Sequence, residues 1–238
     1  MNHHAAQIDV RISVDNPKFD AMTNVVGSLN LYEACKNHGV KKIIFASTGG
    51  AIYGEQEYFP ADEEHPTRPC SPYGIAKLVN EKYLFYYKEI FGIEHVIFRY
   101  ANVYGPRQNP HGEAGVVAIF CNKLLAGQQA VINGDGKNSR DYVFVSDLVK
   151  ANSIALNNNV SGIYNLGTGV ESDVNFVFNT INELTGSGMA EVHGEAKKGE
   201  QFRSVISYKK IMNEHGWQPE IDFASGLKQT VDFFKKLM

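Results

Sequence analysis

The sequence predicts an α/β fold, in which helices cover both faces of a mostly parallel sheet and a smaller lobe lies towards the C-terminus. Short apolar runs bounded by turn residues alternate with segments whose apolar residues recur at helical spacing. Strands that alternate with helices are joined by right-handed crossovers, which makes them parallel neighbours in one sheet. The 238 residues, 43% of them hydrophobic, suffice for one large domain or for a core domain with a small lobe.

The first half of the chain is expected to supply the central strands. Residues 1–7 have the character of a strand end and its following loop, and residues 25–36 carry apolar side chains at helical spacing. Residues 42–46 and 94–99 are short apolar runs of the kind that form buried parallel strands. Between them a long loop leads into a helix at Ser71-Pro72, where Ser71 can cap and Pro72 suits the first turn.

The second half is expected to contain shorter elements. A helix capped by Ser146-Asp147 runs to Leu156, and two short strands flank the Gly134-Asp135-Gly136 turn. The strands are expected at 130–132, 142–145 and 163–166, and the other helices at 115–126, 173–185, 207–215 and 222–237. More glycine and shorter elements indicate the smaller lobe.

Composition excludes several classes of function. The net charge is −3 and no run of Lys or Arg occurs, which argues against nucleic acid as a partner. No stretch approaches the length of a membrane span. The three cysteines are far apart, which favours a reduced, cytoplasmic setting. The His3-His4 pair has no further ligands at suitable spacing, so no metal site is expected.

Tyr73 and Lys77 are the most informative pair in the chain. In a helix that begins at Ser71 they lie one turn apart on one face. An ammonium group beside a phenol favours the phenolate, so Lys77 is expected to lower the pKa of Tyr73 towards the range of a general base. By itself such a spacing is more often a surface pair. The opposite face of the helix carries an apolar stripe, formed by Ile75, Val79, Tyr83, Tyr86 and Ile90.

Four segments, taken in order, carry a resemblance to a known family. They are residues 45–54 (FASTGGAIYG), 71–77 (SPYGIAK), 99–108 (RYANVYGPRQ) and 140–148 (RDYVFVSDL). The chain resembles the extended short-chain dehydrogenase/reductases of the NAD-dependent epimerase/dehydratase family, most closely the UDP-glucose 4-epimerase type. The resemblance covers essentially the whole chain. It implies a Rossmann-like sheet, NAD as cofactor and a UDP-sugar as substrate.

The resemblance implies a role for each matching residue. Tyr73 is the general base that takes the proton of the sugar 4-hydroxyl while hydride leaves C4. Lys77 holds the nicotinamide ribose and lowers the pKa of Tyr73, and Thr48 hydrogen-bonds the 4-oxygen. The 4-keto sugar then rotates and is reduced on its other face. The implied cofactor-binding residues are Asn24, Ser47, Tyr73, Lys77 and Tyr100, although Asn24 is equally well explained as a helix-entry residue.

The substrate side is implied in the same way. Thr48 and Asn102 contact the nucleotide-sugar and Arg140 grips its phosphates, because a guanidinium can donate two parallel hydrogen bonds. A salt bridge of Arg140 to Asp141 or Asp147 is the structural alternative. The remaining implied substrate-binding residues are Lys197, Glu200 and Arg203.

Two departures from the family pattern refine the expectation. Dehydratases and decarboxylases of this superfamily carry an acidic residue after the Ser-Thr turn, whereas this chain has Gly49, Gly50 and Ala51, which favours an epimerase. Lys197 and Glu200 stand where the family has Arg and Asp, so Arg203 is a possible substitute for the phosphate grip. Ser204 is a small residue near the sugar 2-substituent, which motivates the hypothesis that N-acetylated sugars are accepted.

The family's Gly-rich loop has no counterpart in these 238 residues. Residues 1–110 are therefore expected to be the remainder of a dinucleotide-binding domain with the Tyr/Lys pair, forming an incomplete doubly wound sheet. Residues 111–238 are expected to form mainly the nucleotide-sugar-binding lobe, with some segments returning to the sheet. Weaker NAD binding follows from the lost backbone donors. The alternatives are a non-catalytic truncated remnant that binds a nucleotide-sugar or a partner, and another nucleotide-sugar-modifying enzyme of the superfamily. The resemblance also implies a homodimer.

Overall fold

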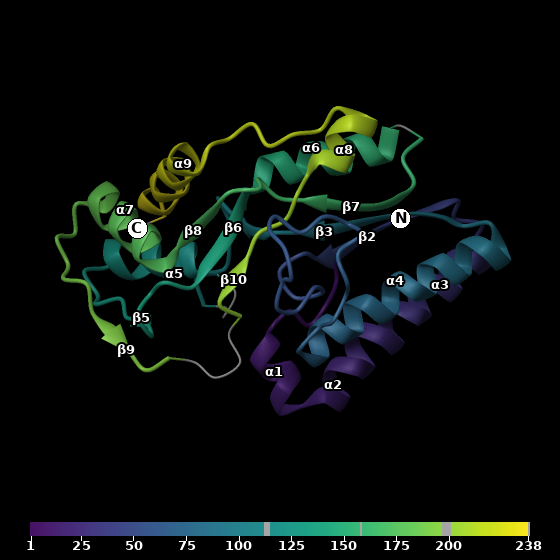
Figure 1. The fold of residues 1–238 in the computed structure, drawn as a ribbon, viewed down its shortest axis with the longest axis horizontal. Coiled ribbons are helices and arrows are strands. Elements are labelled where there is room, and N and C mark those ends of the chain that lie inside the picture. Colours follow the sequence, from purple (N-terminus) through teal and green to yellow (C-terminus); the bar gives the residue numbers. More distant parts are fainter. Residues whose placement is uncertain (112–114, 158, 197–200, 238) are drawn as a thin grey trace.

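The chain folds into two lobes (Figure 1). The computed structural model describes residues 1–111, 115–157, 159–196 and 201–237. A parallel sheet lies between two layers of helices in the lobe that contains the N-terminus, and the C-terminal helix packs in the other lobe. None of the helices in these ranges is both long enough and apolar enough to cross a membrane.

The main sheet has four parallel strands in the order β1-β2-β3-β7. They are β1 (Asn2–His3), β2 (Lys42–Thr48), β3 (Glu94–Tyr100) and β7 (Gly162–Leu166). This confirms the predicted parallel sheet. Thr48 pairs with Tyr100, and Tyr100 pairs with Leu166, so the carboxyl ends of three strands lie level. Ligands of open α/β sheets bind at such an edge.

Helices cover both faces of this sheet because its strands carry apolar side chains on both sides. Ile43 and Phe45 pack towards α3 and α4, whereas Ile44 packs on the opposite side towards α6 and α8 (Figure 1). The helices are α1 (Val10–Asp15), α2 (Pro17–Ala21), the π-helical segment η1 (Met22–Val26), α3 (Gly27–Asn37), α4 (Pro72–Phe91), α6 (Val145–Asn157) and α8 (Lys209–His215).

The second lobe has its own core, built from small sheets and three helices. Phe120, Phe178 and Phe234 meet in it from α5, α7 and α9. Its strands are β4 (Asn102–Tyr104), β5 (Ile132–Asn133), β6 (Ser139–Phe144), β8 (Glu171–Asp173), β9 (His193–Gly194) and β10 (Arg203–Ser204). Its helices are α5 (Val116–Leu125), α7 (Val174–Thr185) and α9 (Phe223–Lys235).

Helix α4 begins as the sequence predicts. Pro72 occupies its first turn and the Ser71 hydroxyl accepts a hydrogen bond from the Gly74 N–H at 3.1 Å. The predicted apolar stripe faces largely outward, since Ile75 is 50% exposed and Ile90 is 62% exposed. The stripe is therefore not what anchors α4 on the sheet. Buried residues of the other faces, including Lys77, Glu81 and Leu84, lie against β2 and β3.

Three local features differ from the predictions. Helix α6 starts at Val145, so Ser146 and Asp147 lie inside its first turn and do not cap it. The buried Asp147 carboxylate instead accepts the backbone N–H groups of Glu220 and Ile221. The strand predicted at 130–132 is β5 (Ile132–Asn133), which pairs with β9. Helices α1, α2 and η1 were not expected, although Asp9 caps α1 and the Asn16-Pro17 pair begins α2.

A buried ion pair joins α4 to the sheet. The guanidinium of Arg99 on β3 donates to Glu81 of α4 through Nε at 3.1 Å and Nη2 at 2.7 Å, and both side chains are almost fully buried. The Ser47 hydroxyl donates to Glu81 Oε1 at 2.6 Å, and Arg99 donates to the Tyr53 hydroxyl at 3.0 Å. The two charges are thus paired and hydrogen-bonded, the condition under which buried charges are tolerated.

We expect Arg99→Met to lower the free energy of unfolding by about 3–5 kcal/mol, because it leaves Glu81 charged and unpaired in the interior. The double variant Glu81→Met/Arg99→Met should recover part of this loss. Urea denaturation measures both. The exposed pair Lys228–Asp232 provides the control, and Lys228→Met should cost less than about 1 kcal/mol. A loss in Arg99→Met no larger than that in the control would contradict the prediction.

Candidate active site

Close backbone approaches bring the start of α4 against the turn that follows β2. A Cβ at Gly74 would lie 2.8 Å from the Ala51 carbonyl oxygen, and one at Gly49 would lie 2.5 Å from Ile206 Cδ1. Only glycine fits at these two contacts without a shift of the neighbours. The contact at Gly74 thereby holds Tyr73 against the turn after β2, and the contact at Gly49 holds Thr48 next to Ile206.

Lys77 is buried beneath this junction. Its side chain is 4% exposed, and Nζ donates a hydrogen bond to the Ala46 carbonyl oxygen of β2 at 2.7 Å. The ammonium lies 4.8 Å from the ring centroid of Phe45 and 5.7 Å from that of Tyr73. Burial lowers the pKa of Lys77 to about 8, although the carboxylates of Asp20 and Glu81 act in the opposite direction. Lys77 therefore titrates close to neutral pH.

The pKa of Tyr73 moves against the prediction. Burial raises it to about 12, the negative charge of Asp20 raises it further, and a hydrogen bond with Thr48 opposes both. The expectation that Lys77 lowers this pKa is wrong for the chain itself. The main reason is burial, which disfavours the charged phenolate, and the Lys77 ammonium itself donates to the Ala46 carbonyl of the strand. At neutral pH Tyr73 is a phenol that is hydrogen-bonded to Thr48.

Thr48 and Asn102 lie beside Gly50 in the turn that follows β2, and Tyr100 ends the neighbouring strand β3. A Cβ at Gly50 would lie 3.5 Å from Asn102 Oδ1 and 3.9 Å from Thr48 Oγ1, so both polar atoms lie next to this glycine. The Tyr100 hydroxyl accepts a hydrogen bond from Asn152 Nδ2 at 3.0 Å. The predicted catalytic residues and Asn102 thus meet at one edge of the sheet.

Two predicted cofactor-binding side chains are engaged within the protein. Asn24 is buried in η1, where Oδ1 accepts the Gln7 N–H at 2.8 Å and Nδ2 donates to the Gln7 carbonyl at 2.9 Å. Ser47 donates its hydroxyl proton to Glu81. These contacts support the loop after β1 and the end of β2. A direct contact of either side chain with a cofactor stays a prediction.

The predicted phosphate-binding arginines lie on β6 and β10, which are neighbours in the second lobe. Arg140 Nη1 donates to the Ser139 carbonyl and Nη2 to the Gln201 carbonyl, each at 2.7 Å. Arg203 pairs with Glu171, with Nε 2.7 Å from both carboxylate oxygens, and its guanidinium lies 3.8 Å from the Phe59 ring centroid. These partners explain Arg203 as a structural residue. The predicted Lys197 and Glu200 lie outside the described residues.

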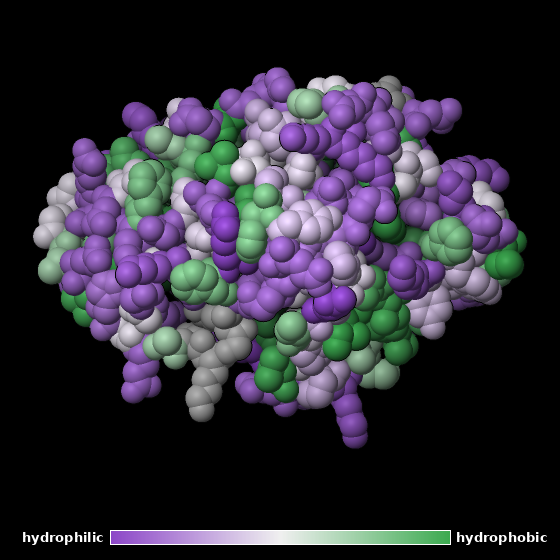
Figure 2. All heavy atoms as spheres, viewed as in Figure 1, coloured by the Kyte–Doolittle hydropathy of each residue, from purple (hydrophilic) through white to green (hydrophobic). Residues whose placement is uncertain are grey.

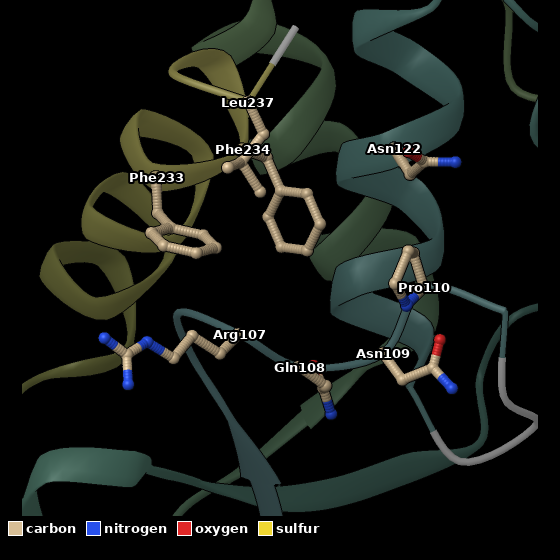
Figure 3. A pocket seen from close by; sticks show the side chains of 8 residues that line it. All are labelled: Arg107, Gln108, Asn109, Pro110, Asn122, Phe233, Phe234 and Leu237. Carbon is tan, nitrogen blue, oxygen red and sulfur yellow. The ribbon is translucent and has the colours of Figure 1, made fainter.

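A pocket of about 310 Å³ opens in the second lobe, away from this junction (Figure 3). Two phenylalanines and a leucine of the C-terminal segment face a polar loop across it. Its lining consists of Arg107, Gln108, Asn109, Pro110, Asn122, Phe233, Phe234 and Leu237. It contains none of the predicted site residues, so it does not bear on the candidate active site.

Sequence reasoning overlooked the charged residues that surround the pair. Glu81 stands four residues after Lys77 on the same helical face, a signal that was available. Asp20 is 1% exposed, and it lies in a helical segment that the apolar pattern alone does not reveal. Both carboxylates raise the pKa of Lys77. Their effect depends on tertiary packing.

Comparison with known proteins identifies the family. The model of the NAD-dependent epimerase/dehydratase family matches residues 1–167. A putative UDP-glucose 4-epimerase of Methanocaldococcus jannaschii is 46% identical over 233 residues, which are 98% of this chain and 76% of that protein. The chain therefore belongs to the NAD-dependent epimerase/dehydratase family, as predicted.

Two solved structures agree with this assignment. The UDP-glucose 4-epimerase of Thermotoga maritima, determined with UDP-glucose, superimposes with a TM-score of 0.96 at 46% identity and covers 99% of this chain and 77% of its own. The UDP-glucose 4-epimerase of Thermus thermophilus, determined in complex with NAD, gives a TM-score of 0.94 at 44% identity, with 100% and 78% covered. The predicted Rossmann-like α/β class is thereby confirmed.

We expect Lys77 to make the stability of the chain depend on pH. Its pKa is about 8 in the fold and 10.5 in its ordinary state, so the unfolded chain binds this proton more tightly. The free energy of unfolding should therefore rise between about pH 8 and pH 10, by at most about 3 kcal/mol from this group. Urea denaturation of the natural chain and of Lys77→Met measures the difference. Lys18→Met, on the exposed surface of α2, is the control. A wild-type minus Lys77→Met difference that stays flat with pH would contradict the expectation.

Proposed function

We propose that this site serves the NAD-dependent 4-epimerisation of UDP-sugars, of the UDP-glucose/UDP-galactose type. The observation that carries the proposal is the junction of Thr48 and Tyr73 above Lys77, next to a turn that has no acid. Gly49, Gly50 and Ala51 cannot transfer a proton, so the chemistry is limited to removal and return of hydrogen at one carbon. The named functions of the similar proteins from M. jannaschii, T. maritima and T. thermophilus support this choice.

The residues at the sheet edge fit a nicotinamide cofactor. Lys77 uses one of its three ammonium protons on Ala46, and Tyr100 stands at the end of the neighbouring strand. Lys77 and Tyr73 would hold the ribose, near Thr48 and Asn102 at the turn of Gly50. NAD, when bound, accepts the C4 hydride and returns it.

Tyr73 is the group proposed to take and return the proton of the 4-hydroxyl. With a pKa of about 12, the Tyr73 phenol of the chain itself keeps its proton at neutral pH. A positive charge beside it is therefore needed for proton transfer near neutral pH. The Lys77 ammonium is the cation built into the fold. Thr48 hydrogen-bonds Tyr73 and is placed to share the proton. A charged Lys77 is therefore a condition for Tyr73 to act.

The two lobes divide the proposed work. Residues 1–110 carry the Tyr/Lys pair and the cofactor edge, while residues 111–238 mainly bind the nucleotide-sugar, and β7 joins the main sheet. Asn102 and Arg140 are the proposed contacts to the sugar and the diphosphate. Contacts across the lobes support this arrangement, since the Ala61 N–H donates to the Val205 carbonyl and the Ser207 N–H donates to the Ala61 carbonyl, on either side of Ile206.

Tyr73→Phe should lower UDP-glucose epimerisation by about 10²–10⁴-fold, because it removes the proton-transferring oxygen and little else. Turnover is measured as UDP-galactose formation with added NAD, alongside an NAD titration. Tyr83→Phe, on the outer face of the same helix, should leave the rate unchanged. Full activity in Tyr73→Phe would remove Tyr73 as the base. A chain that neither binds millimolar NAD nor turns over would favour a non-catalytic role for this polypeptide.

A homodimer in the cytoplasm is part of the proposal. Apolar side chains gather over the lower right of the molecule, where α1, α2 and α4 lie (Figure 2). The exposed ones on α3 and α4 include Leu31, Ile75, Tyr83, Tyr86 and Ile90. Patches of this kind mark interfaces between proteins. Cys35, Cys70 and Cys121 are free thiols, which supports a reducing compartment.

Ile90→Glu should shift the chain from dimer to monomer, because it places a charge in the proposed interface on α4. Sedimentation velocity at matched concentrations measures the oligomeric state. Val149→Glu, at an exposed position of α6 on the other side of the sheet, is the matched control and should stay dimeric. A chain that is monomeric before any substitution would overturn this part of the proposal.

A further inference from the structure

Asp20 is a buried carboxylate next to the candidate active site. Its side chain belongs to α2 and the residue is 1% exposed. Oδ1 accepts hydrogen bonds from Gln7 Nε2 and Asn24 Nδ2, each at 2.9 Å. Oδ2 has no hydrogen-bond partner among the described residues. The carboxylate is thus only partly satisfied.

The direct partners of Asp20 do not neutralise it. Both are neutral amides, and no ion pair within 4 Å involves Asp20 in the described ranges. A buried charge without an opposite charge is costly, and it normally protonates or finds a cation. Burial raises the pKa of Asp20 accordingly. A position that keeps such a group needs a compensating charge at longer range.

Lys77 is a buried cation on α4, the helix against which the helix of Asp20 packs. Helix α2 packs against α4, and the charge of Asp20 acts on both Tyr73 and Lys77. The other titratable groups around Lys77 are Glu81 on its own helix and the imidazoles of His3 and His4 at the end of β1. Burial and the Lys77 charge lower the pKa of both imidazoles, that of His3 to about 4, so His3 is uncharged at neutral pH.

We propose that Asp20 is a positioning residue for this site: it supplies the buried negative charge that keeps the Lys77 ammonium protonated. Through Gln7 and Asn24 it also fixes the loop after β1 and the helix η1 beside that ammonium. The importance of a charged Lys77 rests on the proposed function, whereas the effect of Asp20 on Lys77 does not. The two parts can therefore be tested separately.

The test is a direct titration of Lys77. Lysine labelled with ¹³C at Cε reports the charge of each amine by NMR, and Lys77→Arg assigns the signal. Asp20→Asn should move the Lys77 pKa down from about 8 by roughly one unit, because an attractive charge is lost. Asp20→Glu, which keeps the charge, should restore most of the value. Asp15→Asn, at an exposed end of α1, is the matched control and should leave Lys77 unchanged.

The direction of the shift separates a charge effect from a loosened structure. Water entering the site would raise the Lys77 pKa towards its ordinary value, whereas loss of the charge lowers it. A second neutral variant, Asp20→Ser, should give the same downward shift if Asp20→Asn folds poorly. No shift, or an upward shift, in the neutral variants overturns the proposal.

Turnover gives an independent readout. In the epimerase assay, the alkaline limb of the pH profile for Asp20→Asn should move to lower pH by the same amount as the Lys77 titration. A downward Lys77 shift in a chain without turnover would support the role of Asp20 and reject the proposed function. An unmoved Lys77 in an active enzyme would reject the role of Asp20 and leave the function intact.

Discussion

The buried Glu81–Arg99 ion pair is the constraint on which the site depends. It ties α4 to β3, and through the Ser47 hydroxyl and the Tyr53 phenol it also holds the end of β2 and the loop that follows. Lys77 lies one turn before Glu81, so its position on the sheet follows from the same contact. An ion pair has a fixed geometry and cannot slide as apolar contacts can. The register of α4 against Thr48 is therefore set by charge, while the apolar stripe of α4 is left on the surface.

Among the buried histidine, tyrosine and lysine of this site, two are uncharged at neutral pH. Burial lowers the pKa of His3 to about 4 and raises that of Tyr73 to about 12, so neither carries a charge at neutral pH. Lys77 is the exception, with a pKa of about 8. A fold that buries a phenol and an amine together makes each harder to ionise. Proton transfer at Tyr73 therefore depends on the positively charged groups close to its hydroxyl.

Much of this could be predicted from the sequence, because the main strands and α4 have local signals. The apolar runs of β2 and β3, and the Ser71-Pro72 start, each depend on neighbouring residues alone. The pKa of Tyr73 could not be predicted from the Tyr73–Lys77 spacing, since it depends on the burial of the phenol and on Asp20, which is far away in sequence. Asp147 shows the same limit. Its place in the sequence is typical of a helix cap, but its carboxylate accepts hydrogen bonds from the backbone N–H groups of residues 220 and 221.

Two carboxylates flank Lys77, and their surroundings differ. The charge of Glu81 is matched by the guanidinium of Arg99 and by the Ser47 hydroxyl, so little of it is left to act on other groups. Asp20 meets only the amides of Gln7 and Asn24, and one of its oxygens has no partner in the described chain. Its effect on Lys77 accordingly exceeds that of Glu81. The fold thus uses one carboxylate to hold α4 in place and leaves the other to balance the ammonium.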